Sequence, residues 1–440
     1  MSCPAVITGL GPITAFGVGI DPLWSAMLAG RSAIKRIEAF DPGGFDCQIA
    51  AEMPPDLFNV KKVVPKSYRK ATKVMCRDIE LAVGAAAAAV EDAGLVTKAS
   101  EGEAEPTIDP ARFGCHIGAG LIASDINELA AALMTSRTDD GRFDLGHWGA
   151  HGMENLTPLW LLKYLPNMLA CHVTIVHDCR GPSNTITCCE ASSALSLGES
   201  MRVIERGAAD ACLSGGAEYK LNPMALLRQQ FAGRLARTNG EEDPSKVVRP
   251  FDSRACGTVI GEGGGILVIE SREVAERRGA RPYAQVIGFA ATQSHCPDTV
   301  GLSIPAADES LTNAVRLALD HAGLAPGDVD GLVPFGSSIP AIDAAEAHAI
   351  RTVFGDRAAS LPLVTTIPNV GNCAAGNGAI GLSVAAKALR EQRLPARLHT
   401  EDAEGLDANA GPARDADLKH MLILTTSQGG QNAAVVLKGL

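Results

Sequence analysis

The stretch "RGPSNTITCCEASSALSLGESMRVIERG", residues 180–207, decides the fold of this chain. It opens with a Gly-Pro turn, passes through a short β-branched strand, and then takes the spacing of a helix that ends at Gly207. A strand that runs directly into a helix of small residues is typical of an α/β core. We expect about four turns of buried helix, with Cys188, Cys189 and Glu190 at its start.

The composition is that of a globular chain with a large core. Of its 440 residues, 46% are apolar, 20% are charged and only 4% are aromatic, whereas alanine and glycine are abundant. This balance predicts helices packed closely against sheets. The net charge of −11 argues against nucleic acid as a partner.

The cysteines and the N-terminus indicate the compartment. The twelve cysteines are scattered, without a CxxC pair or metal-ligand spacing. We therefore expect reduced thiols, no bound metal and no cofactor. The N-terminus lacks the pattern of a signal peptide, and the longest apolar run is about half a membrane span. The sequence predicts a cytoplasmic protein without membrane insertion.

A weak internal repeat predicts two similar halves. Residues 193–207 resemble residues 378–392 at a constant offset, and each segment is followed by a strand that ends in two glycines. The halves are predicted to cover residues 1–275 and 276–440. They are expected to form a pseudo-twofold, five-layered α/β/α/β/α body.

Four further segments carry a family resemblance that extends over essentially the whole chain. They read "ADACLSGGAEY", "RPFDSRACGTVIGEGGGILVIE", "FGSSIPAIDAAEAHAI" and "SQGGQN". Together with "RGPSNTIT", they resemble the β-ketoacyl-[acyl-carrier-protein] synthases of the thiolase fold. The resemblance implies a Cys-His-His site, in which a helix N-terminus lowers the pKa of the cysteine and two histidines promote decarboxylation and condensation.

The residues at the three catalytic positions depart from this pattern. The cysteine position corresponds to Glu190, whether it is counted from the "GPS" turn or back from the double glycine at 215–216. The two histidine positions correspond to Phe335 and Asn372. In the loop that gates the site, Gln428 replaces phenylalanine, whereas Gly429 and Gly430 are retained. The resemblance therefore implies a ketosynthase fold without the condensing machinery.

Glu190 is expected to be an ionised plug that fills the oxyanion site. A buried carboxylate needs hydrogen-bond partners, and Asn372 and Gln428 are the expected ones because the fold brings both loops to this helix. The residues leave two alternatives open. In the first, Glu190 is only a helix-capping residue. In the second, the site is shifted by one position, so that Cys189 is the nucleophile. We expect Cys189 to be the buried, inert last residue of the strand.

The pattern is similar to the chain-length-factor class, ketosynthase-like subunits without the cysteine that pair with an active ketosynthase. The resemblance places Trp160, Tyr164 and Met168 at the dimer interface, where Trp160 and Tyr164 line or close the partner's acyl tunnel. Ordinary interface packing is the alternative for these side chains.

The partners implied by the resemblance are an active ketosynthase, or a second copy of the chain, and an acyl carrier protein. Arg69, Lys70 and Lys73, and the group Arg228, Arg234 and Arg237, are possible docking surfaces or simply solvated faces. The alternative function is a stand-alone homodimer. It would use Glu190 for malonyl-carrier-protein decarboxylation or bind acyl groups without chemistry.

Overall fold

The computed structural model describes residues 3–100, 105–295 and 305–440. Its main sheet has ten strands: β1 (Ala5–Thr14), β2 (Gly17–Val18), β5 (Phe113–Gly118), β6 (Ser183–Ile186), β7 (Ala211–Glu218), β8 (Gly263–Ser271), β9 (Ala284–Gln293), β10 (Gly331–Val333), β13 (His420–Thr426) and β14 (Gln431–Lys438). The strand order is β10-β13-β14-β9-β1-β8-β7-β5-β6, with β2 paired to β1. Two short pairs lie apart, β3 (Ile34–Arg36) with β4 (Ile49–Ala51) and β11 (Arg393–Leu394) with β12 (Arg414–Asp415).

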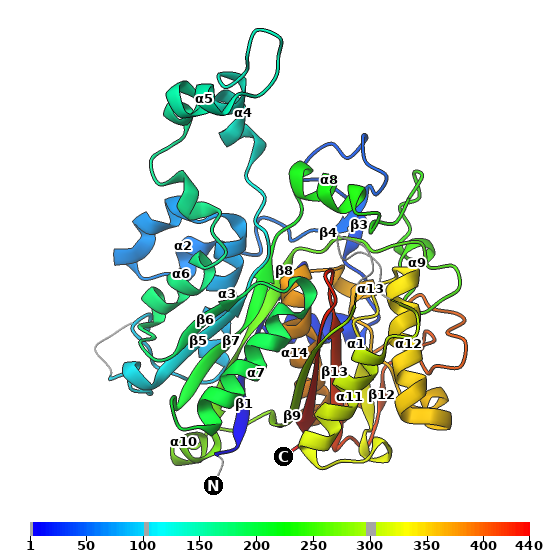
Figure 1. Cartoon of the computed structure of the whole chain (residues 1–440). Coiled ribbons are helices and arrows are strands. Elements are labelled where there is room, and N and C mark those ends of the chain that lie inside the picture. Colours follow the sequence, from blue (N-terminus) through cyan, green and yellow to red (C-terminus); the bar gives the residue numbers. More distant parts are fainter. Residues whose placement is uncertain (1–2, 101–104, 296–304) are drawn as a thin grey trace.

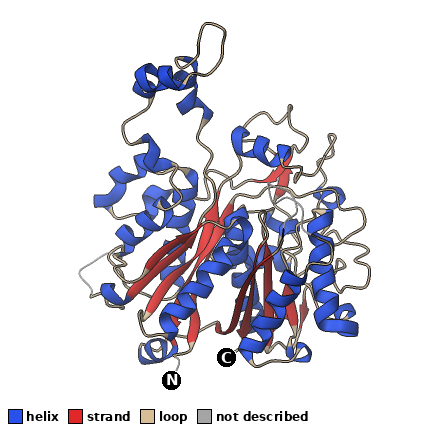
Figure 2. Cartoon of the chain, viewed as in Figure 1, coloured by secondary structure: helices blue, strands red, loops and turns tan. Residues whose placement is uncertain are grey.

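The helices and the sheet form the predicted five layers. One outer helix, α3 (Arg77–Asp92), covers β1 and β8, and another, α11 (Glu309–Ala322), covers β9 and β14. Between the two halves of the sheet lie α7 (Ser192–Glu205) and α14 (Asn377–Glu391), which contact each other (Figures 1 and 2). The thiolase-like α/β fold is thus confirmed. One difference is that β1 and β9 pair over three residues, which joins both halves into a single sheet.

Ten further α-helices lie in the described ranges. They are α1 (Ile20–Leu28), α2 (Val60–Val63), α4 (Ile126–Met134), α5 (Leu145–His147), α6 (Met168–His177), α8 (Pro223–Phe231), α9 (Pro244–Val247), α10 (Arg272–Arg277), α12 (Pro340–Phe354) and α13 (Ile367–Val370). Of these, α4 and α5 lie on an arm that projects from the body at the top of Figure 1. In the described ranges, none of the helices is both long enough and apolar enough to cross a bilayer.

Small residues allow the close packing that the composition predicts. A Cβ atom on Gly9 of β1 would lie 2.3 Å from the carbonyl oxygen of Ala89, and one on Gly11 would lie 2.1 Å from that of Ala85. Both carbonyls belong to α3, so the helix backbone rests directly on the strand. Larger side chains on this face would push the two layers apart.

The two central helices begin in the same way, as the internal repeat predicts. A short 3-10 turn precedes each of them, η6 (Cys189–Ala191) before α7 and η9 (Ala374–Gly376) before α14. The first residue of each turn has a left-handed backbone, with φ of 45° at Cys189 and 46° at Ala374. Because an alanine adopts this conformation in the second half, the left-handed backbone at Cys189 belongs to the repeated scaffold and does not mark a nucleophile.

Candidate functional site

Glu190 occupies the middle of η6, where the chain turns from β6 into α7. Only 4% of its surface is exposed. The turn is held by Ser192, whose hydroxyl accepts a hydrogen bond from the N–H of Cys188 (2.8 Å) and donates one to the carbonyl of Cys189 (2.7 Å). The sequence position predicted for the nucleophile therefore carries a buried carboxylate at the start of the central helix.

Arg234 is the direct charged partner of Glu190. Its Nη2 donates to Glu190 Oε1 in an ion pair, and Arg234 is itself only 3% exposed. The sequence predicted that Arg234 lies with Arg228 and Arg237 on a docking surface or a solvated face, and the burial of Arg234 shows that this prediction is wrong for it. Nothing in the local sequence distinguishes the three arginines. The one sequence feature that pointed to a buried arginine was Glu190 itself, because a buried carboxylate requires a compensating positive charge.

Asn372 makes the predicted contact with Glu190. Its Nδ2 lies 3.4 Å from Glu190 Oε1. The orientation of the amide is fixed because its Oδ1 accepts hydrogen bonds from Ala374 N (2.8 Å) and Asn377 Nδ2 (2.6 Å). The side chain thus presents its N–H group to the carboxylate, and the interaction predicted from the sequence is confirmed.

Gln428 also reaches Glu190, but through its backbone. The N–H of Gln428 donates to Glu190 Oε2 at 3.1 Å, which confirms Gln428 as the second partner predicted from the sequence. The following glycines have φ of 95° (Gly429) and 84° (Gly430), a left-handed conformation that favours glycine. Gln293 Nε2 donates to the carbonyl of Gly429 (2.6 Å), which helps hold the loop against the site.

The surroundings of Glu190 favour its ionised form. Burial alone would raise its pKa, but the Arg234 guanidinium, its own backbone N–H, the Gln428 N–H and the Asn372 amide hold the pKa below its usual value. Both carboxylate oxygens are engaged. This geometry agrees with an ionised plug that accepts three side-chain or backbone donors from distant parts of the chain.

The placement predicted for Cys189 needs a correction. It is not the buried last residue of a strand, because β6 ends at Ile186 and Cys189 is the half-buried first residue of η6. Burial, together with the negative charges of Glu190 and Glu218, raises the pKa of its thiol to about 12. The thiol is therefore protonated at neutral pH and a poor nucleophile, which agrees with the inert cysteine that the sequence predicts.

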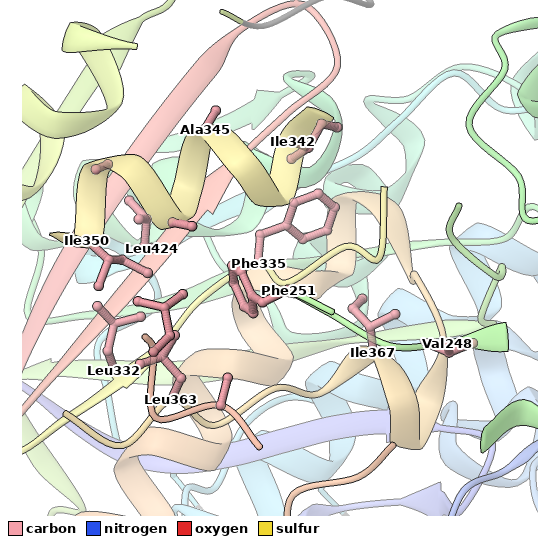
Figure 3. Close-up of a cluster of buried hydrophobic side chains, with 14 of the residues drawn as sticks. Val248, Phe251, Leu332, Phe335, Ile342, Ala345, Ile350, Leu363, Ile367 and Leu424 are labelled. Atoms are coloured by element: carbon pink, nitrogen blue, oxygen red, sulfur yellow. The ribbon is translucent and has the colours of Figure 1, made fainter. Parts of the chain in front are cut away.

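Phe335 lies in a hydrophobic cluster and not against the carboxylate. It follows β10, is 3% exposed, and packs with buried side chains that include Phe251 and Ile342 (Figure 3). Its backbone N–H donates to Glu346 Oε1 at 2.7 Å. Of the residues at the three predicted catalytic positions, Glu190 and Asn372 are joined by a hydrogen bond. Phe335 packs in the hydrophobic core instead.

Truncation of Phe335 is expected to be strongly destabilising. Phe335→Ala removes a buried ring from a packed core, so the free energy of unfolding should fall by about 3–5 kcal/mol. Equilibrium urea unfolding measures the change. Phe231→Ala is the matched control, because Phe231 is 80% exposed and its loss should change stability by less than about 0.5 kcal/mol. Equal effects of the two variants would contradict the core role.

Trp160 and Tyr164 lie in the segment that leads from α5 on the arm back to α6, and Met168 is the first residue of α6. The Trp160 and Tyr164 rings are neighbours, with centroids 5.2 Å apart. The Tyr164 hydroxyl donates to Glu128 Oε2 at 2.8 Å, which ties it to α4. Met168 is the first residue of α6 and packs on the cluster of buried side chains beneath it. The aromatic pair is thus held in one place on a half-buried surface.

Comparisons with known proteins give the family. The chain matches the β-ketoacyl synthase N-terminal domain over residues 3–275 and the β-ketoacyl synthase C-terminal domain over residues 283–401. Over 438 residues it is 31% identical to 3-oxoacyl-[acyl-carrier-protein] synthase 2 of Staphylococcus aureus, covering 98% of this chain and 100% of that protein. The protein of the same name from Coxiella burnetii is 32% identical, with 98% and 97% covered.

Solved structures agree with this match. A β-ketoacyl synthase from Burkholderia phymatum has a TM-score of 0.83 at 25% identity, and the ishigamide ketosynthase/chain length factor has a TM-score of 0.82 at 26% identity. Both alignments cover 100% of both chains. The sequence motifs, the five-layered fold and these matches together show that the chain belongs to the β-ketoacyl synthase family.

Proposed function

We propose that this chain is a non-condensing, chain-length-factor-type subunit of a type II fatty-acid or polyketide synthase. In this role it pairs with a cysteine-bearing ketosynthase and shapes the acyl tunnel of that partner. The observation that carries the proposal is the buried ion pair between Glu190 and Arg234 at the start of the central helix. It fills the position that the family resemblance assigns to the nucleophile.

The chemistry of Glu190 argues against acyl transfer by this chain. Attack of a carboxylate on a thioester would form an anhydride, which is uphill in free energy. Loss of a catalytic nucleophile costs on the order of a millionfold in rate. Phe335 and Asn372, at the positions assigned to the histidines, offer no imidazole for decarboxylation or for stabilising the resulting enolate.

A carrier protein is the second proposed partner. The relatives are named for the acyl-carrier protein, and this chain has an exposed basic surface that suits an acidic partner. There are no acidic residues between Asp56 and Asp78. Six basic side chains in this interval are exposed and make no ion pair with the residues that the structure describes: Lys61, Lys62, Lys66, Arg69, Lys70 and Lys73.

The stand-alone alternative finds less support in the site. A general base needs a carboxylate that is free to take up a proton. The carboxylate of Glu190 is ion-paired to Arg234 and accepts two further hydrogen bonds, which keep its pKa low. We therefore do not assign decarboxylation to Glu190.

Reconstitution tests the proposed function. The chain is purified alone and with a cysteine-bearing ketosynthase from the same source, and each preparation receives acyl- and malonyl-carrier protein. Co-elution of the two chains as a heterodimer, with condensation product formed only when both are present, is the expected result. Condensation or CO2 release by this chain alone would refute the assignment.

The tunnel role of Trp160 has its own expected outcome. If its ring closes the end of the partner's tunnel, Trp160→Ala should shift the products of the reconstituted pair to longer chains, as measured by mass spectrometry. Trp148→Ala is the matched control, since Trp148 directly follows α5 and its ring lies against Phe143. An unchanged product-length distribution with Trp160→Ala would show that the Trp160 ring only packs at the interface and does not close the tunnel.

A further inference from the structure

A cavity of about 410 Å³ lies where the starts of α3 and α4 meet the segment that leads from β7 to α8. The volume is within the range that small-molecule sites occupy. Neither Glu190 nor any of the residues that donate hydrogen bonds to it from other parts of the chain lines this cavity. The cavity is therefore separate from the plug.

The cationic side chains in the wall of this cavity are already paired. Of the described residues that line it, only Arg77 and Lys163 are basic. Arg77 is ion-paired to Glu262 at 2.5 Å and to Glu80 at 3.2 Å, and Lys163 is ion-paired to Glu128 at 2.6 Å. The wall therefore offers no spare positive charge to an anionic ligand.

Two acidic side chains of the wall, Asp78 and Asp125, make no ion pair with any residue that the structure describes. Asp78 is only 2% exposed. Its Oδ1 accepts a hydrogen bond from the N–H of Tyr219 (2.9 Å), and its Oδ2 accepts only a long one from the thiol of Cys76 (3.7 Å). Asp125 is exposed and caps α4, with its Oδ1 2.8 Å from the backbone nitrogen of Asn127. The wall thus carries negative charge without a paired cation.

The burial of Asp78 without a paired cation has an energetic cost. Burial itself, and then the negative charge of Glu218, raises the pKa of Asp78 to about 7. The positive charge of Lys220 opposes this shift, but Lys220 forms an ion pair with Glu218. A cation that enters the cavity would offset the cost of the ionised carboxylate.

The rest of the wall suits the apolar or aromatic part of a ligand. Three aromatic side chains line the cavity, those of Phe40, Tyr164 and Tyr219. The Tyr164 hydroxyl donates to Glu128 Oε2 (2.8 Å) and the Tyr219 hydroxyl donates to the carbonyl of Leu221 (2.6 Å), so both rings are held in place. Aromatic rings attract cations through their electron-rich faces. Aliphatic and thioether side chains also line the cavity: Met75, Ile126, Leu221 and Met224.

The acidic groups do not form a metal site. In the part of the chain that the structure describes, no three His, Cys, Asp or Glu side chains are grouped so that they could hold a metal ion. We propose that the cavity binds a small organic cation, in which an ammonium group is attached to an apolar or aromatic body. Asp78 and Asp125 provide the negative charge for the ammonium group, and the aromatic and aliphatic side chains take the body. The inference does not depend on the partner-subunit role, because binding is measured on the single chain.

Isothermal titration calorimetry at pH 8, where Asp78 is mostly ionised, tests the proposal on the full chain. The probes are benzyltrimethylammonium, benzyl alcohol, phenylacetate and magnesium chloride at constant ionic strength. We expect benzyltrimethylammonium to bind at least about tenfold more tightly than the other three. Asp78→Asn should weaken its binding on the order of tenfold, and Asp125→Asn by a smaller factor, because Asp125 is exposed. The matched control is Asp109→Asn, at an exposed aspartate outside the lining that also accepts a backbone N–H, and it should bind like the unaltered protein.

Three outcomes would overturn the proposal. They are the absence of benzyltrimethylammonium binding up to about 10 mM, equally tight binding of any other probe, and equal affinities of Asp78→Asn and Asp109→Asn. Circular dichroism checks that each variant folds. If Asp78→Asn fails to fold, Asp125→Asn decides the matter, because asparagine caps a helix about as well as aspartate does. An affinity of Asp125→Asn equal to that of the control then overturns the proposal.

Discussion

Replacing Arg234 with methionine is expected to lower the free energy of unfolding by about 3–5 kcal/mol. The substitution leaves the carboxylate of Glu190 buried without its charged partner, and the hydrogen bonds from Asn372 and Gln428 N–H cannot replace a full opposite charge. Equilibrium urea unfolding at pH 7 measures the loss. A decrease below about 1 kcal/mol, as for an exposed ion pair, would contradict this account of the site.

The matched control for Arg234→Met is Arg237→Met. The Arg237 side chain is 79% exposed and lies 3.7 Å from Asp46, so its removal should cost less than about 1 kcal/mol. The double variant E190Q/R234M removes both charges together. It should regain most of the lost stability, because a neutral amide does not need a cation.

The effect of Arg234→Met should also depend on pH. In the unaltered protein the pKa of Glu190 is low, so the ion pair stabilises the fold above the carboxyl's unfolded pKa of about 4.3 and loses this effect at lower pH. In the variant the unpaired carboxylate should have a raised pKa, so acid relieves its burial cost. Both effects make the stability difference shrink below about pH 5. A difference that grows in acid would contradict the assignment.

A cysteine in place of Glu190 is expected to accept an acyl group without restoring condensation. In E190C the thiol would lie beside the freed guanidinium of Arg234, and a nearby cation lowers the pKa of a thiol. Acyl transfer from acyl-carrier protein should therefore appear as an added mass. Condensation should remain at least about a thousandfold below that of an active ketosynthase, because Phe335 and Asn372 supply no imidazole.

Two variants identify the residue that carries the acyl group in that experiment. E190A should show no added mass, and E190C/C189S should keep it, which assigns the acyl group to the introduced thiol. Condensation by E190C alone would show that the residues at the histidine positions are not needed. The absence of any adduct on E190C would show that the acyl group does not reach the start of the central helix.

The sequence predicted the architecture because its signals are local and repeated. The abundance of alanine and glycine predicted close packing of helices on the sheet, which the structure shows at Gly9 and Gly11 of β1, and the matching segments at 193–207 and 378–392 predicted the two central helices. The family resemblance supplied the spacing of the nucleophile position, and two counts along the chain assigned that position to Glu190. The contact with Asn372 followed because the fold brings the two loops together.

The rest of the site depends on tertiary contacts that leave no local pattern. Arg234 resembles its exposed neighbours in sequence, and only the packing of the loop after α8 buries it against a residue 44 positions away. Residue types alone do not predict that Gln428 contacts Glu190 through its backbone N–H. Cys189 was misplaced because the 3-10 turn between β6 and α7 cannot be separated from a strand by hydrophobic pattern alone.

Intact-protein mass spectrometry of the unaltered chain tests the central claim most directly. The chain is incubated with acyl-carrier protein, alone and together with a cysteine-bearing ketosynthase, and the mass of each subunit is measured. The account predicts that the acyl mass appears on the partner only, and that this chain keeps its own mass in both cases. A stable acyl adduct on this chain, whether on Cys189 or Glu190, would contradict it.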